Sequence, residues 1–315
     1  MGITRMMKRI QYFQYGSLEE LQLDEVKIPK VGQGNILVKV KAASVNPMDW
    51  KIRRGEMKPI SGFSFPRGLG HDFAGVVEAI GPAVKKINVG DEVFGVTDIK
   101  QAGTFAEYTI AKEDYVGMKP ASRSFEEAAA LSLVSVTAWS ALIGMAKLTK
   151  NHTIFINGCL GSVGRSAVQI AKIQGARIIG SCSGSGREEA LALGVDEVVD
   201  YRSFQVTPYR KCFDIVFDTA GALSFKQCKA MLVKKGKSLH IVPTLSKMLI
   251  SLFSSHHHIV FGKPSRSCLN GLSEAMRKGQ IRPKIGRIVS LNEGISAFAE
   301  LEQTGFPKGK LVIVP

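Results

Sequence analysis

Three glycines at three-residue spacing carry the clearest chemical signal in the sequence. An apolar run at 153–157 predicts a strand before them, and an amphipathic run at 162–174 predicts a helix after them. Glycines let a backbone turn sharply toward a phosphate, and the free N–H groups of a helix start favour negative charge. A dinucleotide pyrophosphate is therefore expected here, in preference to a tight turn that binds nothing. The expected phosphate-binding residues are Gly158, Gly161, Ser162, Val163 and Gly164.

The next predicted strand, at 177–182, bears on which dinucleotide is bound. In NAD-dependent folds an acidic residue about 20 residues beyond the glycines holds the ribose hydroxyls and would repel a 2′-phosphate. No Asp or Glu occurs between Arg165 and Arg187. The strand instead ends in Ser181-Cys-Ser-Gly-Ser-Gly-Arg187, whose hydroxyls and guanidinium suit a phosphate dianion. This favours NADP(H); in the alternative, Arg187 only opens a solvated helix.

Strands and helices alternate around this loop and predict βαβ units on a parallel sheet, an α/β fold. The predicted strands are 153–157, 177–182, 197–200, 213–218 and 238–242, with helices at 162–174 and 187–193. A capping box, Ser124-Phe-Glu-Glu127, predicts the start of a helix that runs to about residue 146.

The earlier part of the chain has a different pattern. Short β-rich runs broken by glycine and proline predict a small barrel or sandwich. These runs are 36–42, 73–80, 91–96 and 104–110. The tail at 309–315 predicts one more strand, which we expect to return to this first domain. With 315 residues and 45% hydrophobic content, two domains are expected.

Composition excludes several classes of protein. No run of eighteen apolar residues occurs and the first ten residues lack the pattern of a secretory signal, so a cytoplasmic location is expected. Five cysteines without CxxC spacing do not indicate a zinc lobe. A net charge of +15 attracts polyanions, yet it is spread along the chain without a nucleic-acid-binding motif. Specific nucleic-acid binding is not expected, whereas an anionic cofactor and loose contact with acidic membranes are compatible.

Four further motifs combine with the glycine loop into a resemblance that covers nearly the whole chain. They are Ala43-Ser-Val-Asn-Pro-Met-Asp-Trp-Lys51, Gly70-His-Asp-Phe-Ala-Gly-Val-Val77, Val89-Gly-Asp-Glu-Val-Phe94 and Thr137-Ala-Trp. Together they resemble the medium-chain dehydrogenase/reductase superfamily, and most of all its zinc-independent quinone oxidoreductase and alkenal/enone reductase branch. The resemblance implies a GroES-like β-rich catalytic domain at 1–121, a Rossmann doubly wound domain at 122–260, and a return to the catalytic domain at 261–315. It also implies an active-site cleft between the domains and a homodimer.

The resemblance bears on metal binding as well. Zinc alcohol dehydrogenases of this family have a cysteine where this chain has Asn46, and a histidine followed by glutamate at His71-Asp72. A catalytic zinc needs three protein ligands, so no metal site is expected. His71 is then a hydrogen-bonded structural histidine. The adjacent histidines 256–258 are expected to diverge from one another in a loop.

Residue by residue, the resemblance places Asn46 and Lys51 at the nicotinamide and substrate end as catalytic residues. It assigns the following to cofactor binding: Asn46, Thr137, Ser181, Ser183, Arg187, Tyr201, Val242 and Lys310. Without zinc, an electrophilic acceptor is the better substrate, so we expect hydride transfer to a quinone or an α,β-unsaturated carbonyl. Lys51 or the Asn46 amide would donate a hydrogen bond to the carbonyl oxygen. In the alternative, Lys51 is a solvated lysine paired with Asp49.

Three other functions stay open at this point. A zinc-type alcohol dehydrogenase would need the metal that Asn46 argues against. A dinucleotide-binding protein without turnover, such as a redox sensor, would bind NADPH and consume none. A membrane or nucleic-acid partner driven by the +15 charge would bind in a salt-sensitive way.

Overall fold

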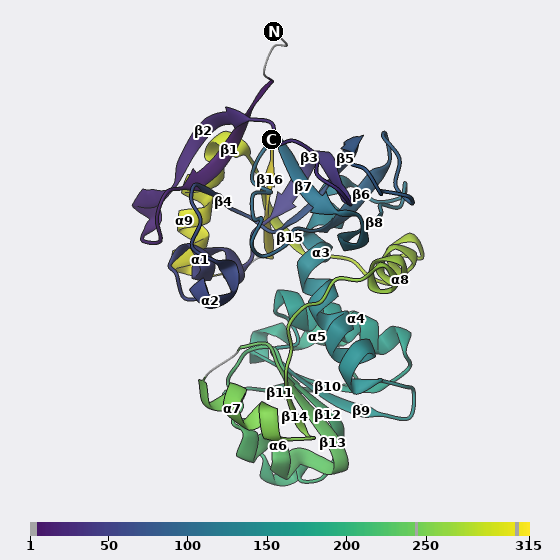
Figure 1. The fold of residues 1–315 in the computed structure, drawn as a ribbon. Helices are drawn as coiled ribbons and strands as arrows, with labels where there is room; N and C mark the ends of the chain where they lie inside the picture. The colour runs from purple at the N-terminus through teal and green to yellow at the C-terminus, as the bar shows by residue number, and fades with distance from the viewer. Residues whose placement is uncertain (1–4, 243–244, 306–308) are drawn as a thin grey trace. The chain divides into compact units, whose positions relative to one another are not determined.

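The computed structural model describes residues 5–242, 245–305 and 309–315. The chain forms two units (Figure 1). The first is made of Met1–Leu133 and Pro264–Pro315, and the second is Val134–Lys263. The second unit is thus inserted into the sequence of the first, which is why the tail of the chain must come back to complete the first unit.

The first unit is built on two sheets. The smaller has the order β2-β1-β4, and the larger has the order β15-β16-β3-β5-β6-β8, with β7 also paired to β3. The strands are β1 (Met6–Tyr12), β2 (Gln22–Lys27), β3 (Asn35–Ser44), β4 (Arg67–Gly68), β5 (Asp72–Ile80), β6 (Glu92–Val96), β7 (Tyr108–Lys112), β8 (Val116–Met118), β15 (Ile285–Ser290) and β16 (Lys310–Val314). The return of the tail is confirmed, because Val312 of β16 pairs with Ser44 of β3.

One strand expectation in this unit is wrong in its bounds. The run at 104–110 forms a strand only from Tyr108 onward. Phe105 accepts a hydrogen bond from Ile10 and donates one to Leu69, so this part of the run follows the smaller sheet instead. Its side chain is fully buried in the core of the unit, with Phe73 and Phe298. A period-2 pattern cannot show which of two neighbouring sheets a segment joins.

Among the described residues, four helices lie wholly within the first unit, and none of them was predicted from the sequence. They are α1 (Pro47–Arg53), α2 (Lys58–Ser61), α8 (Arg266–Arg277) and α9 (Gly294–Thr304). α1 carries one candidate site residue, Lys51, and begins directly after another, Asn46, which is its N-cap. Its first helical residue is Pro47, a position where proline is well tolerated because its missing N–H has no helical partner.

The long helix expected after Ser124 is confirmed. α3 (Phe125–Trp139) continues as a π-helical segment to Ala146. Ser124 and Glu127 form the expected capping box: the Ser124 hydroxyl accepts from the Glu127 N–H at 3.2 Å, and the Glu127 carboxylate accepts from the Ser124 N–H at 3.1 Å. Within the described residues, Phe125–Ala146 is the one helix long and apolar enough to cross a membrane, with a mean hydropathy of 1.7. It is 61% buried inside the protein, as a core helix would be.

The second unit is a six-stranded parallel sheet with the order β11-β10-β9-β12-β13-β14. This is the order of the doubly wound dinucleotide-binding fold. The strands are β9 (Thr153–Asn157), β10 (Arg177–Cys182), β11 (Glu197–Asp200), β12 (Phe213–Asp218), β13 (Leu232–His240) and β14 (His257–Ile259). The helices that connect them are α4 (Ser162–Ile173), α5 (Arg187–Leu193), α6 (Phe225–Met231) and α7 (Leu245–Phe253).

Two expectations for this sheet need correction. β13 begins at Leu232 instead of residue 238, because Leu232 and Lys237, at the two ends of the lysine-rich stretch, pair with Phe213 and Ile215 of β12 across a register shift. The loop expected at 256–258 is wrong, since His257 and His258 belong to β14 and pair beside Ser238 and Leu239. The divergence of the three histidine side chains is confirmed: they bond to Gly236, Ser238 and Ser255 respectively.

Candidate functional site

The glycine loop has the geometry that a pyrophosphate requires. Gly158 has a φ of +79°, in the left-handed region that favours glycine. A Cβ on Gly164 would lie 2.1 Å from the carbonyl oxygen of Gly158, so only glycine fits there. Gly161 is the N-cap of α4 and supplies no side-chain cap, while Ser162 and Val163 form the half-buried first turn. The N–H groups of that turn are thus available to an anion.

A buried hydrogen-bonded chain holds this loop from the sheet side. The Ser181 hydroxyl donates to the Asn157 amide oxygen at 2.6 Å and accepts from the Gly158 N–H at 3.0 Å. The Asn157 amide in turn donates to Asp218 at 2.8 Å. Ser181 is 1% exposed. The structure therefore places Ser181, expected as a cofactor ligand, in a supporting position behind the loop.

Asp218 is the anchor of this chain, and the sequence analysis did not single it out. Besides Asn157, its carboxylate accepts hydrogen bonds from the N–H groups of Gly221 and Leu223. Burial alone would raise the pKa of Asp218, but the contact with His240 at 3.5 Å and the hydrogen bonds from Asn157 and the Leu223 N–H hold the pKa below its usual value. The available signal was its position at the end of a predicted strand, where parallel sheets gather functional groups.

The residues expected around the 2′-phosphate do gather, at the carboxyl ends of β10 and β11. Ser183 is half-buried and its hydroxyl lies 3.1 Å from that of Ser185. Arg187 is exposed and donates to the Val198 carbonyl at 3.0 Å. Tyr201 is 55% exposed, and its backbone N–H donates to Cys182 at 3.1 Å. A hydroxyl, a guanidinium and an aromatic ring thus lie at one edge of the sheet.

Asp200 lies at the same edge and was missed. It ends β11 directly beside Cys182, the last residue of β10. A Cβ built on Gly184 would be 2.9 Å from a carboxylate oxygen of Asp200, which shows how close this charge is to the loop that contains Ser183 and Arg187. The sequence argument considered the second strand of the sheet, β10, whereas Asp200 lies on the third, β11. Its charge opposes the binding of a phosphate dianion.

Thr137 and Val242 also belong to the unit that holds the glycine loop. Thr137 is half-buried in α3, and a Cβ on Gly262 would lie 2.7 Å from its hydroxyl oxygen. Val242 is half-buried just after β13, and its side chain would be 2.8 Å from a Cβ on Gly221. Val242 is therefore close to the turn that Asp218 holds.

In the first unit, Asn46 and Lys310 meet in a buried polar cluster with Asp72. The Lys310 ammonium donates to the Asn46 amide oxygen at 2.6 Å and to the Val45 carbonyl at 2.7 Å. The Asn46 amide nitrogen donates to Ser44 at 3.2 Å and to Asp72 at 2.9 Å. Both N–H groups of this amide are therefore already used, and Asn46 has none left for a substrate oxygen.

Burial dominates the electrostatics of this cluster. It raises the pKa of Asp72 and lowers the pKa of Lys310, because each charged form loses its hydration. The two groups offset this loss by lying 4.0 Å apart. Asp72 also accepts from the backbone N–H and the hydroxyl of Ser44.

His71 is hydrogen-bonded, as expected. Its Nδ1 lies 2.8 Å from the carboxylate of Asp49, and both side chains are buried. Its Nε2 has no hydrogen-bond partner among the described residues. The other oxygen of Asp49 accepts from the Asn46 N–H at 2.7 Å and caps α1.

Lys51 lies half-exposed in α1, one turn beyond Asn46. Among the ion pairs of the described residues, none joins Lys51 to Asp49, whose carboxylate is occupied by His71 and Asn46. The surface-pair alternative is therefore absent from this structure. The other cation of α1, Arg53, is buried and paired with Glu302, so Lys51 is the half-exposed cation of this helix.

The donor set of the first unit does not suit a metal ion. Over residues 5–242, 245–305 and 309–315, no group of three His, Cys, Asp or Glu side chains is placed to hold one. Asn46 offers an amide whose oxygen already accepts from the Lys310 ammonium. A buried ammonium beside this position repels a second cation.

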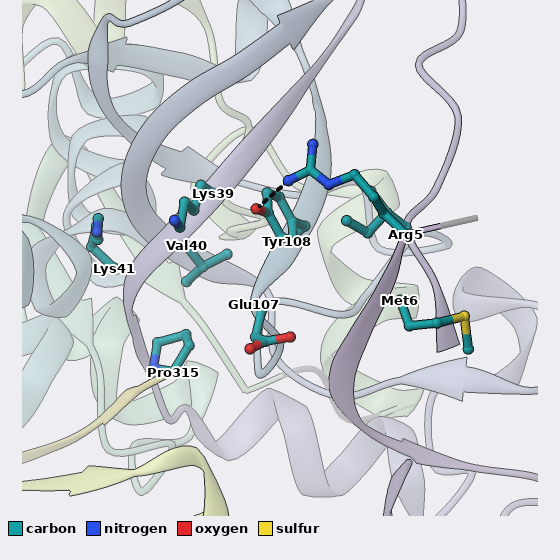
Figure 2. A pocket seen from close by; sticks show the side chains of 9 residues that line it. Arg5, Met6, Lys39, Val40, Lys41, Glu107, Tyr108 and Pro315 are labelled. Atoms are coloured by element: carbon teal, nitrogen blue, oxygen red, sulfur yellow. Dashed lines mark hydrogen bonds between the residues drawn. The ribbon is translucent and has the colours of Figure 1, made fainter. Parts of the chain in front are cut away.

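A separate pocket of 370 Å³ opens on the first unit, and none of the predicted site residues lines it. Figure 2 shows its lining, with Arg5 reaching across to the Tyr108 hydroxyl, to which it donates at 2.9 Å. Its wall includes Lys39, Lys41 and Glu107. This pocket is therefore not part of the Asn46 cluster.

Comparison with known proteins agrees with both halves of this description. Residues 32–121 match the alcohol dehydrogenase GroES-like domain, and residues 193–313 match the zinc-binding dehydrogenase domain. The chain is 32% identical to a chloroplastic quinone oxidoreductase of Triphysaria versicolor, covering 99% of each chain. It is also 32% identical to a 2-methylene-furan-3-one reductase of Solanum lycopersicum, covering 100% of this chain and 80% of that one. The solved quinone oxidoreductase of Coxiella burnetii superposes with a TM-score of 0.87 at 28% identity, covering 99% of this chain and 100% of that one.

Proposed function

Because the chain belongs to the medium-chain dehydrogenase/reductase superfamily, in its quinone oxidoreductase and enone reductase branch, we propose a specific activity for it. It is a zinc-independent, NADPH-dependent oxidoreductase that transfers hydride to a quinone or an α,β-unsaturated carbonyl. The observation that carries this proposal is the glycine cradle at the start of α4, where a Cβ on Gly164 would strike the Gly158 oxygen. Oxidoreductase chemistry with a nicotinamide follows from the family; the cofactor's phosphate and the acceptor are the proposed parts.

In this proposal the pyrophosphate is held by the N–H groups of the first turn of α4, and the 2′-phosphate by Ser183 and Arg187. The exposed guanidinium of Arg187 supports NADPH, since it supplies a fixed positive charge. Asp200 opposes this preference, because its carboxylate lies against Gly184. A preference for NADPH therefore requires the guanidinium to outweigh this carboxylate.

The independence from zinc is supported by the Lys310–Asn46 contact. The Lys310 ammonium lies 2.6 Å from the Asn46 amide oxygen. This oxygen therefore already accepts a hydrogen bond, and the ammonium adds positive charge where a metal ion would have to bind. Without a Lewis acid, the acceptor must be electrophilic by itself, as quinones and enones are.

When bound, the nicotinamide supplies the hydride, and this chain's residues orient the reactants and stabilise charge. Lys51 is proposed to donate a hydrogen bond to the carbonyl oxygen, where negative charge develops. Asn46, with both N–H groups engaged, acts as a positioning residue that starts α1 and so places Lys51. A homodimer and a cytoplasmic location stay predictions.

The test is the oxidation of NADPH by the purified protein with a panel of quinones and of enones of different chain length. We expect turnover with at least one of these classes and a lower KM for NADPH than for NADH. Turnover of benzyl alcohol with bound zinc would contradict the proposal and identify an alcohol dehydrogenase. Binding of NADPH with no consumption by any acceptor would instead identify a protein without turnover.

A further inference from the structure

The pocket of 370 Å³ on the first unit is lined by several cations, and the proposed reaction uses none of its residues. Small-molecule sites have volumes of about 300–1,000 Å³, so this pocket is of a size that holds a ligand. Figure 2 shows Lys39 and Lys41 on one side of the pocket and Arg5 on the other, with Glu107 and Tyr108 between them. The charged side chains therefore surround one common space.

Three segments that are far apart in the sequence form this pocket. Lys39 and Lys41 are two residues apart in β3, so their side chains leave the same face of the strand, about 7 Å from one another along it. Tyr108, the first residue of β7, pairs directly beside Lys39. Just before β1, Arg5 lies over the ring of Tyr108, with its guanidinium carbon 5.6 Å from the ring centre. Strand pairing thus fixes the positions of these side chains.

The ammonium groups of Lys39 and Lys41 have no carboxylate partner within the described residues. Among the ion pairs and side-chain hydrogen bonds of 5–242, 245–305 and 309–315, none includes either ammonium. Glu107 lies in the same lining, but its carboxylate accepts from the Lys8 N–H at 2.7 Å and pairs with neither lysine. Two like charges on one face repel each other, and an anion bound between them removes this repulsion.

Arg5 and Tyr108 have hydrogen-bond donors left for the same anion. Within the described residues, the Arg5 guanidinium donates to Glu78 at 3.0 Å and to the Tyr108 hydroxyl at 2.9 Å, which uses two of its five N–H groups. The Tyr108 hydroxyl accepts this bond, so its own proton is available to a ligand. Because Glu78 offsets the charge of Arg5, the excess positive charge of the pocket comes from the two lysines of β3.

We propose that this pocket binds a small organic phosphate, at a site separate from that of the proposed reaction. A phosphate monoester has three terminal oxygens and two negative charges, so it accepts hydrogen bonds from both lysines and from the Tyr108 hydroxyl at once. Glu107 repels the phosphate, which therefore lies on the lysine side of the pocket. The Glu107 carboxylate accepts instead from a hydroxyl group of the organic part, whose carbon atoms contact Met6 and Ile28.

The experiment is a titration of the full chain with glycerol 3-phosphate and, separately, with inorganic phosphate, followed by the phosphorus NMR signal of the probe. We expect saturable binding of glycerol 3-phosphate that is tighter than that of inorganic phosphate and weakens when NaCl is raised to about 0.5 M. Lys39→Gln/Lys41→Gln should weaken the binding of both probes at least about tenfold. Glu107→Gln should tighten the binding of inorganic phosphate, since a like charge is removed. The matched control is Lys85→Gln/Lys86→Gln, which removes the same charge from two exposed lysines outside the lining and should leave binding unchanged.

Several outcomes would overturn the proposal. If the probes bind only at the glycine loop of the second unit, Lys39→Gln/Lys41→Gln will bind them as tightly as the unmodified chain does. The proposal also fails if glycerol 3-phosphate does not bind, if inorganic phosphate binds as tightly, or if the control variant loses as much affinity. Because both lysines of β3 are exposed, circular dichroism should be the same for the variant and the unmodified protein. None of these readouts depends on NADPH oxidation, so the proposed reaction and this site stand or fall separately.

Discussion

The ammonium of Lys310 lies 2.6 Å from the amide oxygen of Asn46, a residue 264 positions earlier in the chain. This contact joins the last strand of the first unit to the start of α1, the helix that carries Lys51. Asp72 completes the arrangement from β5, 2.9 Å from the Asn46 amide nitrogen. The candidate catalytic helix is thus positioned by a buried polar cluster, which can be tested by removing its charges.

Lys310→Met should destabilise the protein by about 3–5 kcal/mol, because it leaves the Asp72 carboxylate buried without its cation. Urea unfolding measures the change. Adding Asp72→Asn should recover part of the loss, since the uncompensated charge is then gone. Lys39→Met, on an exposed lysine, is the control and should cost little. Equal stability of Lys310→Met and Lys39→Met would show that the buried contact does not matter.

Gly164→Ala should damage the glycine loop itself. Its Cβ would lie 2.1 Å from the Gly158 oxygen, so the backbone must shift, at about 1–3 kcal/mol for overpacking. The matched control is Gly161→Ala, whose Cβ would lie 3.3 Å from the same oxygen in a backbone conformation that alanine adopts. Gly164→Ala should lower the thermal midpoint clearly more than Gly161→Ala does. Titration with NADPH should show that the Gly164→Ala protein binds the cofactor more weakly. A Gly164→Ala protein that binds and melts normally would contradict the cradle.

Lys51→Ala should lower kcat by about 10²–10³, the usual cost of losing one donor to a developing oxyanion. The assay is NADPH oxidation with the best acceptor from the panel. Lys41→Ala removes an exposed lysine of β3 and should leave kcat unchanged. Full activity of Lys51→Ala with an unchanged KM would remove Lys51 from the mechanism.

Arg187→Ala and Asp200→Asn should shift cofactor preference in opposite directions. Removing the guanidinium should raise the KM for NADPH about tenfold or more, the loss of one charge-assisted contact, and change the KM for NADH little. Removing the carboxylate near Gly184 should lower the KM for NADPH. Steady-state kinetics with both cofactors measure this. If neither variant alters the ratio of the two KM values, the 2′-phosphate does not bind at this edge.

His257 should make stability depend on pH. Burial lowers its pKa from 6.5 to about 4, so the folded protein keeps it neutral where the unfolded chain takes up a proton. Stability should therefore be full above 6.5 and fall as the pH drops from 6.5 toward 4. His257→Gln should flatten this part of the profile in urea unfolding. The control is the neighbouring His256→Gln, and a profile that is equally steep in both variants would show that His257 is not its source.

The sequence by itself determined the features that depend on neighbouring residues. The glycine spacing, the strands at 153–157, 177–182 and 213–218, and the capping box of Ser124 and Glu127 all recur in the structure at the predicted residues. They could be predicted because turn geometry, side-chain periodicity and helix capping act over a few residues. The motifs spread along the chain supplied the family in the same way, as local signatures in a fixed order.

Only the tertiary structure decided which role each side chain of a shared site has. Ser181 is a support for the loop because its strand lies beside Asn157, and Asp200 reaches the predicted phosphate edge because β11 pairs in register with β10. The Asn46 amide donates both of its N–H groups, to Asp72 and to Ser44, and its oxygen accepts from Lys310 near the end of the chain. These contacts depend on which strands become neighbours in the folded protein. Residues that are far apart in the sequence can be hydrogen-bond or charge partners without any periodic pattern in the sequence that reveals it.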